Sequence, residues 1–267
     1  MIGIFDSGFG GLTIFKEIKK ALPAYDFIYL GDSLRAPYGG RSQEAIFEFT
    51  REAVDFLFKQ GCSLVILACN TASAEALKKL QQEWLIENFP DRHILGVIRP
   101  LAEAAVKQSR FGKVGIIGTR STVSSQAYVH ELQKLKPAVK VYQQAAPLLV
   151  PLIEEGVLDR PETRMILKKY LRPLKERQID TLILGCTHYP LLQKEIQRIS
   201  GKQVKVLDVA KIVAEKLADY LKRHPETESR LEKNHQIKYL TTDDSRRFSE
   251  LGSKFLGEKI KAEKAEL

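Results

Sequence analysis

Cysteine is scarce in this chain. Its 267 residues include only Cys62, Cys69 and Cys186, and no two of them form a C-x-x-C pair. An odd and sparse set of cysteines argues against a disulfide scaffold and fits a reducing compartment. The five histidines are scattered, and only His188 lies near a cysteine, so the ligand spacing of a zinc finger is missing. We therefore expect neither a disulfide framework nor a bound metal.

Long apolar runs are missing as well. The longest fall far short of the roughly 20 residues that a membrane-spanning helix needs. The N-terminus, MIGIFDSGFGG, has neither the basic segment nor the apolar segment of a secretory signal. The composition, 44% hydrophobic and 28% charged, is ordinary for a soluble protein. We expect a cytoplasmic protein without membrane contact, and the length allows two domains.

Positive charge is in excess, but no motif accompanies it. Lys and Arg number 42 against 33 Asp and Glu, a formal charge of +9. This balance would suit an anionic small substrate or weak contact with nucleic acid. A solvated surface explains it more simply, because the basic residues lie mostly on helical stretches interleaved with acids. The charge alone does not decide the function.

Strand-like and helix-like segments alternate along most of the chain. Such alternation predicts right-handed crossovers and parallel sheets, and continuous apolar strands suit sheets covered on both faces. We expect two similar α/β domains that face each other across a cleft, one formed by residues 1–95 plus 209–267 and the other by 96–208. The expected strands are 2–5, 27–30, 63–68, 94–98, 113–118, 139–144, 181–185, 204–208 and 237–244.

Polar or glycine-rich loops follow several of these strands, where sites form in open parallel sheets. The loop DSGFGG, residues 6–11, matches neither the dinucleotide fingerprint nor a P-loop, so a nucleotide site is not indicated. Its backbone N–H groups suit a carboxylate, whereas Asp6 suits an ammonium group. In GDSLRAPYGG, residues 31–40, the Tyr38 hydroxyl and the Gly39 N–H are reasonable donors to a small polar ligand.

Two further loops, CNTAS and GCTHYP, each carry a cysteine at or beside the end of an apolar strand. Cys62 lacks polar neighbours and is expected to be inert core. Cys69 and Cys186 lie where a strand gives way to a helix, and the N-terminal dipole there lowers a thiol pKa from about 8.5. Pro190 suits an early helix position. The hydrogen-bonding neighbours of the two thiols are Asn70, Thr71, Thr187 and His188.

The pair of cysteines indicates acid–base chemistry. A single activated thiol would suggest covalent catalysis. Two thiols on opposite sides of a ligand allow one to remove a proton while the other donates one, which inverts a carbon centre. A redox disulfide between them is the rival interpretation, and the spacing leaves both open.

Taken together, five ordered motifs resemble the glutamate racemases of the cofactor-independent aspartate/glutamate racemase superfamily. They are IGIFDSGFGGLT, YLGDSLRAPYG, ACNTAS, PLLVPLIEEG and LGCTHYPLL, within residues 2–192. The resemblance implies two pseudo-twofold-related α/β domains, no cofactor, and glutamate bound between the domains. It further implies Cys69 and Cys186 as proton donor and acceptor, and the following substrate contacts: Asp6, Ser7, Tyr38, Gly39, Asn70, Thr71, Thr187 and His188.

The resemblance carries further implications and some departures. Asp6, Asp32, Glu154 and His188 lie where the family has groups that tune the thiols, and Thr122 is favoured over Thr119 as another substrate contact. The family also implies D-glutamate for peptidoglycan, and we expect a homodimer. The second loop reads GDSLR rather than GDTAR, and Arg99 stands where an acidic residue is common.

Other functions remain open at this point. Aspartate racemisation is the nearest rival within the enzymes. A binding module that closes on an acidic ligand without turnover is a rival from another class. Contact with nucleic acid or a topoisomerase is suggested only by the charge of +9, and salt-sensitive binding of DNA would be its signature.

Overall fold

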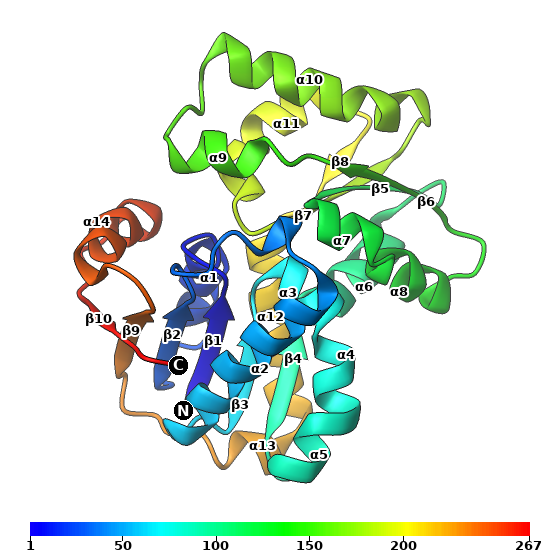
Figure 1. The fold of residues 1–267 in the computed structure, drawn as a ribbon. Coiled ribbons are helices and arrows are strands. Elements are labelled where there is room, and N and C mark those ends of the chain that lie inside the picture. Colours follow the sequence, from blue (N-terminus) through cyan, green and yellow to red (C-terminus); the bar gives the residue numbers. More distant parts are fainter.

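The structure, a computed structural model, describes residues 1–267 and contains two parallel sheets (Figure 1). Six strands form the first sheet, in the order β10-β9-β2-β1-β3-β4, and four form the second, in the order β6-β5-β7-β8. The strands of the first sheet are β1 (Ile2–Asp6), β2 (Phe27–Gly31), β3 (Leu64–Leu67), β4 (His93–Gly96), β9 (Ile237–Thr241) and β10 (Ala262–Lys264). Those of the second are β5 (Lys113–Gly118), β6 (Lys140–Ala145), β7 (Thr181–Gly185) and β8 (Lys205–Val206).

The two sheets repeat one topology. Within the first sheet, the first four strands of the chain are arranged as β2-β1-β3-β4. The four strands of the second sheet have the equivalent arrangement, β6-β5-β7-β8. Every strand pair is parallel. The predicted fold class, two similar α/β units with parallel sheets, is therefore confirmed. We call the units the first and second lobes after their sheets. The exact domain boundaries near residues 95 and 209 stay a prediction.

Helices cover both faces of the first sheet because its strands are apolar on both sides. Ile2 and Ile4 pack into one hydrophobic cluster together with residues of α1 (Leu12–Ala21) and α12 (Val209–Arg223). Phe5, which points to the opposite face, packs into a second cluster with residues of α2 (Gln43–Lys59). The layers fix the strand ends, and hence the loops that follow them, at one edge of the sheet.

Other helices connect the strands or extend the lobes. The helical segment between β3 and β4 is divided into short pieces, α3 to α5, with a π-helical turn at Leu80–Trp84 between α4 and α5. These pieces are α3 (Asn70–Glu75), α4 (Leu77–Lys79) and α5 (Leu85–Asn88). The remaining helices are α6 (Ile98–Gln108), α7 (Arg120–Ser124), α8 (Ala127–Leu135), α9 (Leu149–Glu154), α10 (Pro161–Glu176), α11 (Gln193–Ser200), α13 (Pro225–Glu228) and α14 (Ser245–Leu256). Two 3-10 turns are η1 (Tyr38–Gly40) and η3 (Tyr189–Leu192).

The excess positive charge is confined to one part of the chain. Residues 96–208 hold 19 of the 42 Lys and Arg but 10 of the 33 Asp and Glu, which leaves 42 − 19 = 23 and 33 − 10 = 23 elsewhere. The second lobe therefore accounts for the whole net charge of +9. No helix combines the length and the apolar character that crossing a membrane requires.

Candidate active site

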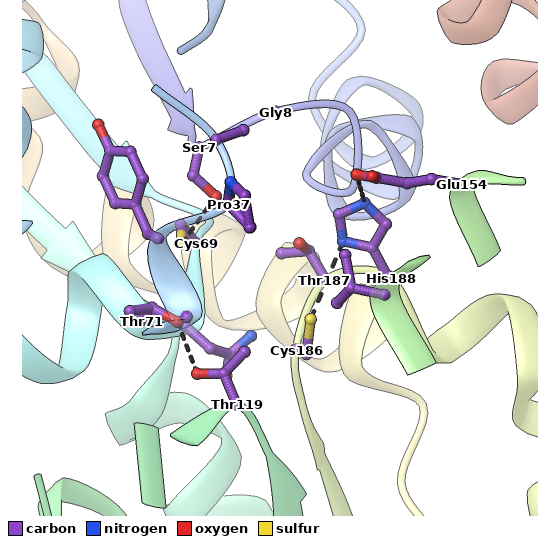
Figure 2. Close-up of a pocket in the computed structure, with 15 residues that line it drawn as sticks. Ser7, Gly8, Pro37, Cys69, Thr71, Thr119, Glu154, Cys186, Thr187 and His188 are labelled. Carbon is purple, nitrogen blue, oxygen red and sulfur yellow. Dashed lines mark hydrogen bonds and ion pairs between the residues drawn. The ribbon is translucent and has the colours of Figure 1, made fainter. Parts of the chain in front are cut away.

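A pocket lies at the carboxyl ends of strands from both sheets. The loops after β1, β2 and β3 line it from the first lobe, and those after β5, β6 and β7 line it from the second (Figure 2). Its lining is Ser7, Gly8, Ala36, Pro37, Tyr38, Gly39, Cys69, Asn70, Thr71, Thr119, Val150, Glu154, Cys186, Thr187 and His188. Nine of the ten site residues predicted from the sequence are in this lining; Asp6 is the one that is not.

Cys69 is the N-cap residue of α3 and is almost completely buried. Its Sγ lies 3.4 Å from Ser7 Oγ and accepts from the Ala72 N–H at 3.5 Å. The helix N-terminus was expected to lower the thiol pKa, and this expectation is wrong. Burial instead raises the pKa of Cys69 to about 12, and the negative charge of Asp6 acts in the same direction. A six-residue helix offsets too little of the desolvation cost.

Cys186 has a different environment from Cys69. It is followed by a turn and the short η3, in which Pro190 takes an early position, so no regular α-helix begins beside this thiol. Cys186 Sγ lies 3.9 Å from His188 Nδ1, and His188 Nε2 lies 3.1 Å from Glu154 Oε1 (Figure 2). Burial lowers the pKa of His188, but its hydrogen bonds with Cys186 and Glu154 outweigh burial and raise that pKa to about 10. His188 is therefore protonated at neutral pH.

Asp6 lies behind the lining. It is fully buried, and its Oδ2 accepts from the Gly8 N–H at 3.1 Å, whereas its Oδ1 has no partner. Burial raises the pKa of this carboxyl, and the charge of His188 opposes the rise. Asp6 acts electrostatically on both Cys69 and His188.

Tyr38 lines the pocket, but its hydroxyl is already engaged. It donates to Asp32 Oδ2 at 2.5 Å, so its hydrogen is used within the protein, and the expected contact of Tyr38 with a ligand stays a prediction. Asp32 is fully buried and also accepts from Arg35 Nε at 2.6 Å and from the Thr242 hydroxyl at 2.8 Å. Asp32 thus joins the loop after β2 to the end of β9, and its role in tuning a thiol stays a prediction.

Three threonine hydroxyls meet where the lobes touch. Thr71 Oγ1 lies 2.9 Å from Thr119 Oγ1 and 3.3 Å from Thr122 Oγ1, and the latter two are 2.9 Å apart. Thr119 lines the pocket, and Thr122 lies behind it with no exposed surface. Of the two, Thr119 therefore has the direct contact with the pocket, and the choice between them as a ligand contact stays a prediction.

Glycine is required where the loops approach closely. A Cβ on Gly10 would lie 2.3 Å from Thr187 Oγ1 and 2.6 Å from His188 Nδ1. A Cβ on Gly39 would lie 2.6 Å from Thr119 Cβ. Both contacts join one lobe to the other, so these glycines allow the second lobe's polar side chains to reach the pocket.

Four lining residues were not singled out from the sequence. Gly8, Ala36, Pro37 and Val150 all lie inside motifs quoted above, but none carries a reactive group. Only their contact with the pocket reveals them, and no signal in residue type would have separated them from ordinary loop residues.

The three cysteines are free thiols. Two α/β lobes of one topology, with a thiol from each on a shared pocket, define a class of protein suited to proton transfer on two sides of a bound ligand. The family model of Asp/Glu/Hydantoin racemases matches residues 2–217. The chain belongs to this family and is a racemase, an isomerase.

Individual relatives give the same result. The chain is 44% identical over 263 residues to a glutamate racemase of Geobacter metallireducens, covering 97% of this chain and 93% of the relative. A crystal structure of a glutamate racemase isoform from Bacillus anthracis superposes with a TM-score of 0.91 at 37% identity, covering 100% of this chain and 97% of the other. The glutamate racemase of Francisella tularensis, solved in complex with D-glutamate, gives 0.86 at 33% identity, covering 100% and 96%.

Proposed function

We propose that this protein interconverts L- and D-glutamate without a cofactor, by proton transfer at the α-carbon between Cys69 and Cys186. The observation that carries the proposal is the placement of the two thiols. Each follows the third strand of its lobe, and both line the same pocket. Relatives that match nearly the whole chain are glutamate racemases, which supports glutamate as the substrate.

The polar groups of the pocket suit an amino acid with two carboxylates. Hydroxyl and amide groups can donate to carboxylate oxygens. The pocket holds such groups on Ser7, Asn70, Thr71, Thr119 and Thr187. We assign the unpartnered Oδ1 of Asp6 as the acceptor for the substrate ammonium.

We assign the resting acid to Cys69 and the resting base to Cys186. The raised pKa of Cys69 keeps this group a thiol. The His188 imidazole, whose pKa is raised, lies 3.9 Å from Cys186 Sγ, and we assign this pair to the side of the pocket that accepts the α-proton. Cys186 then takes the α-proton, and the electron pair of the C–H bond stays on the substrate. The Cys69 thiol gives its proton to the opposite face, which inverts the centre.

The reverse direction uses the same groups in exchanged roles. After one turnover Cys186 carries a proton and Cys69 is a thiolate. In this form the enzyme can bind and convert the other enantiomer, and exchange of the thiol protons with solvent restores the starting form. The positive ammonium of a bound amino acid favours thiolate formation in an otherwise dry site.

We further propose that the D-glutamate formed serves peptidoglycan synthesis and that the protein is a homodimer.

The test is α-proton exchange in D₂O, followed by NMR with purified protein and no added cofactor. L- and D-glutamate are supplied separately to the wild type, Cys69→Ala and Cys186→Ala. Cys62→Ala is the matched control, because this thiol is buried outside the pocket. We expect racemisation in the wild type and the control, and none in either of the other variants. Residual exchange in one variant identifies the enantiomer that its remaining thiol faces.

Two outcomes would contradict the proposal in different ways. Absence of exchange in folded wild type, with glutamate still bound, would indicate a binding protein. Faster turnover of aspartate than of glutamate would move the assignment to aspartate. Analytical ultracentrifugation tests the dimer: a monomer that sediments as such while fully active would contradict it.

A further inference from the structure

Tyr128, on α8 of the second lobe, reaches across to the first lobe. Its side chain is fully buried, and its hydroxyl donates to Asn70 Oδ1 at 2.6 Å. Asn70 is the first residue of α3 and directly follows Cys69. A side chain outside the pocket lining is therefore joined to one that lines it.

This hydrogen bond fixes which way the Asn70 amide faces. A buried hydroxyl must direct its hydrogen at an acceptor, and Asn70 Oδ1 is the only partner of the Tyr128 hydroxyl. If the amide were rotated by half a turn, its NH2 would face the hydroxyl and the hydroxyl hydrogen would have no acceptor. Burial raises the pKa of Tyr128 well above its usual value, so the hydroxyl keeps its hydrogen throughout the physiological range.

The other end of the amide is unoccupied. Asn70 Nδ2 is buried and has no hydrogen-bond partner, although Asn70 lines the pocket. An unpaired buried donor is costly, and an arriving acceptor removes that cost. We propose that Tyr128 is a positioning residue that holds the Asn70 NH2 toward the pocket, where it donates to a carboxylate oxygen of the substrate.

The chemistry of the held amide selects the substrate group. In this orientation it offers N–H donors and no acceptor, so it favours a carboxylate and not an ammonium group. The opposite orientation would place the amide oxygen against the carboxylate. This inference rests on the proposed function, because it takes the bound ligand to be an amino acid with carboxylates.

The Tyr128 ring also packs against Gly185, and a variant that removes only the hydroxyl keeps this packing. A Cβ on Gly185 would lie 3.4 Å from Tyr128 Cε2, so the ring packs against the residue that precedes Cys186. Tyr128→Phe keeps this packing and removes only the hydroxyl. Tyr239→Phe, at a buried tyrosine of β9 outside the pocket, is the matched control.

The test is a double-mutant cycle on the kinetics with L- and D-glutamate. The proteins are the wild type, Tyr128→Phe, Asn70→Ala and the double variant. Losing one oriented hydrogen bond to a charged group changes affinity by about tenfold. We expect Tyr128→Phe to raise KM about tenfold for both enantiomers, to change kcat less, and to have no further effect on KM in the Asn70→Ala background. Tyr239→Phe should leave KM unchanged.

Three results would overturn the inference. An unchanged KM in Tyr128→Phe, or an equal rise of KM in both backgrounds, would show that Tyr128 does not act through Asn70. If Tyr128→Phe fails to fold, the variant Asn70→Asp is measured instead, because it places a carboxylate oxygen where the NH2 group of Asn70 was. Its KM should exceed that of Asn70→Ala, and a KM at or below that value overturns the inference. If the folded wild type shows no turnover, the proposed function is wrong as well. If the wild type is active and only the KM results disagree, the inference about Tyr128 alone is wrong.

Discussion

Cys69 and Cys186 occupy the same position in two lobes of the same topology, yet their partners differ. Each thiol follows the third strand of its lobe, β3 or β7. The hydrogen-bond partners of Cys69 are neutral, the Ser7 hydroxyl and the Ala72 N–H, whereas Cys186 has the His188 imidazole beside it. The backbone arrangement is repeated and the electrostatics are not. The two thiols therefore lie in different electrostatic surroundings before any substrate binds.

The first prediction concerns pH. The hydrogen bonds of His188 with Cys186 and Glu154 raise its pKa to about 10, against 6.5 for a free imidazole. We expect kcat/KM in the wild type to fall as pH rises through about 10, because the positive charge beside Cys186 is then lost. Glu154→Gln removes one of the stabilising partners and should move this fall to lower pH by about one unit. The measurement is a pH–rate profile of both proteins.

The same group makes stability depend on pH. Because the folded pKa of His188 lies above the unfolded one, the protonated group stabilises the fold fully below pH 6.5. This contribution is lost as pH rises from there through about 10. Urea unfolding of the wild type and His188→Asn at pH 6 and pH 9 should show a smaller difference at pH 9. An equal difference at both values would contradict the raised pKa.

Much of the fold could be predicted from the sequence because it is encoded locally. Apolar runs of four to six residues identify strands such as β1 and β7, and loops with polar residues after them indicate the pocket. The equivalence of Cys69 and Cys186 needed one further regularity, the repeated strand–Cys–Thr pattern, whereas the order of the strands within each sheet came only from the structure.

The parts that could not be predicted depend on partners distant in the chain. Nothing local shows that the Tyr38 hydroxyl is used by Asp32, or that Thr242 completes that site. The pKa of Cys69 was expected to fall because the helix N-terminus is visible in the sequence, whereas complete burial is a property of the assembled lobes. Arg99 of α6 pairs with Glu131 of α8 at 3.3 Å, a contact between two helices that residue type alone does not give.

Two adjacent glycines provide a sharp test of the approach between the lobes. A Cβ on Gly39 would lie 2.6 Å from Thr119 Cβ, whereas one on Gly40 would meet nothing within 4 Å. Gly39→Ala should push Thr119 out of place and lower kcat/KM by about 100-fold, since a shift of about 1 Å can have that effect. Gly40→Ala should retain full activity and gain about 0.5 kcal/mol in stability. Equal effects in steady-state assays of the two variants would contradict the close contact.

Substitution of Asp32 can distinguish two roles for this residue: holding the loop after β2 in place, or tuning the pKa of a thiol. Asp32→Ala removes the acceptor for Arg35, Tyr38 and Thr242 and leaves a partly buried guanidinium with Glu52 as its remaining carboxylate. We expect a loss of about 3 kcal/mol in the free energy of unfolding, measured with urea. Thr242→Val removes one hydrogen bond and should cost about 1 kcal/mol. A shifted pH–rate profile with unchanged stability would instead assign Asp32 to the thiols.

Because the net positive charge lies in the second lobe, any contact with nucleic acid should involve that lobe. On α10, the exposed Lys168, Lys169 and Lys175 have no carboxylate partner, whereas Arg172 pairs with Glu176 and Arg164 with Glu195. About three free cations would displace about three counterions from duplex DNA, which gives a slope of about −3 for log affinity against log salt concentration. Any binding of DNA at this helix should therefore weaken about 20-fold between 50 and 150 mM salt.

Neutralising these lysines tests the location of the contact. Replacing all three with glutamine should abolish the binding of DNA measured by fluorescence anisotropy and leave racemisation unchanged, because none of them lines the pocket. The matched control neutralises three exposed lysines of the first lobe that also lack carboxylate partners, Lys222, Lys259 and Lys261, and should bind DNA as the wild type does. A slope of about −6 or steeper, or binding that survives the triple substitution, would require a wider basic surface than α10 alone and would contradict the prediction.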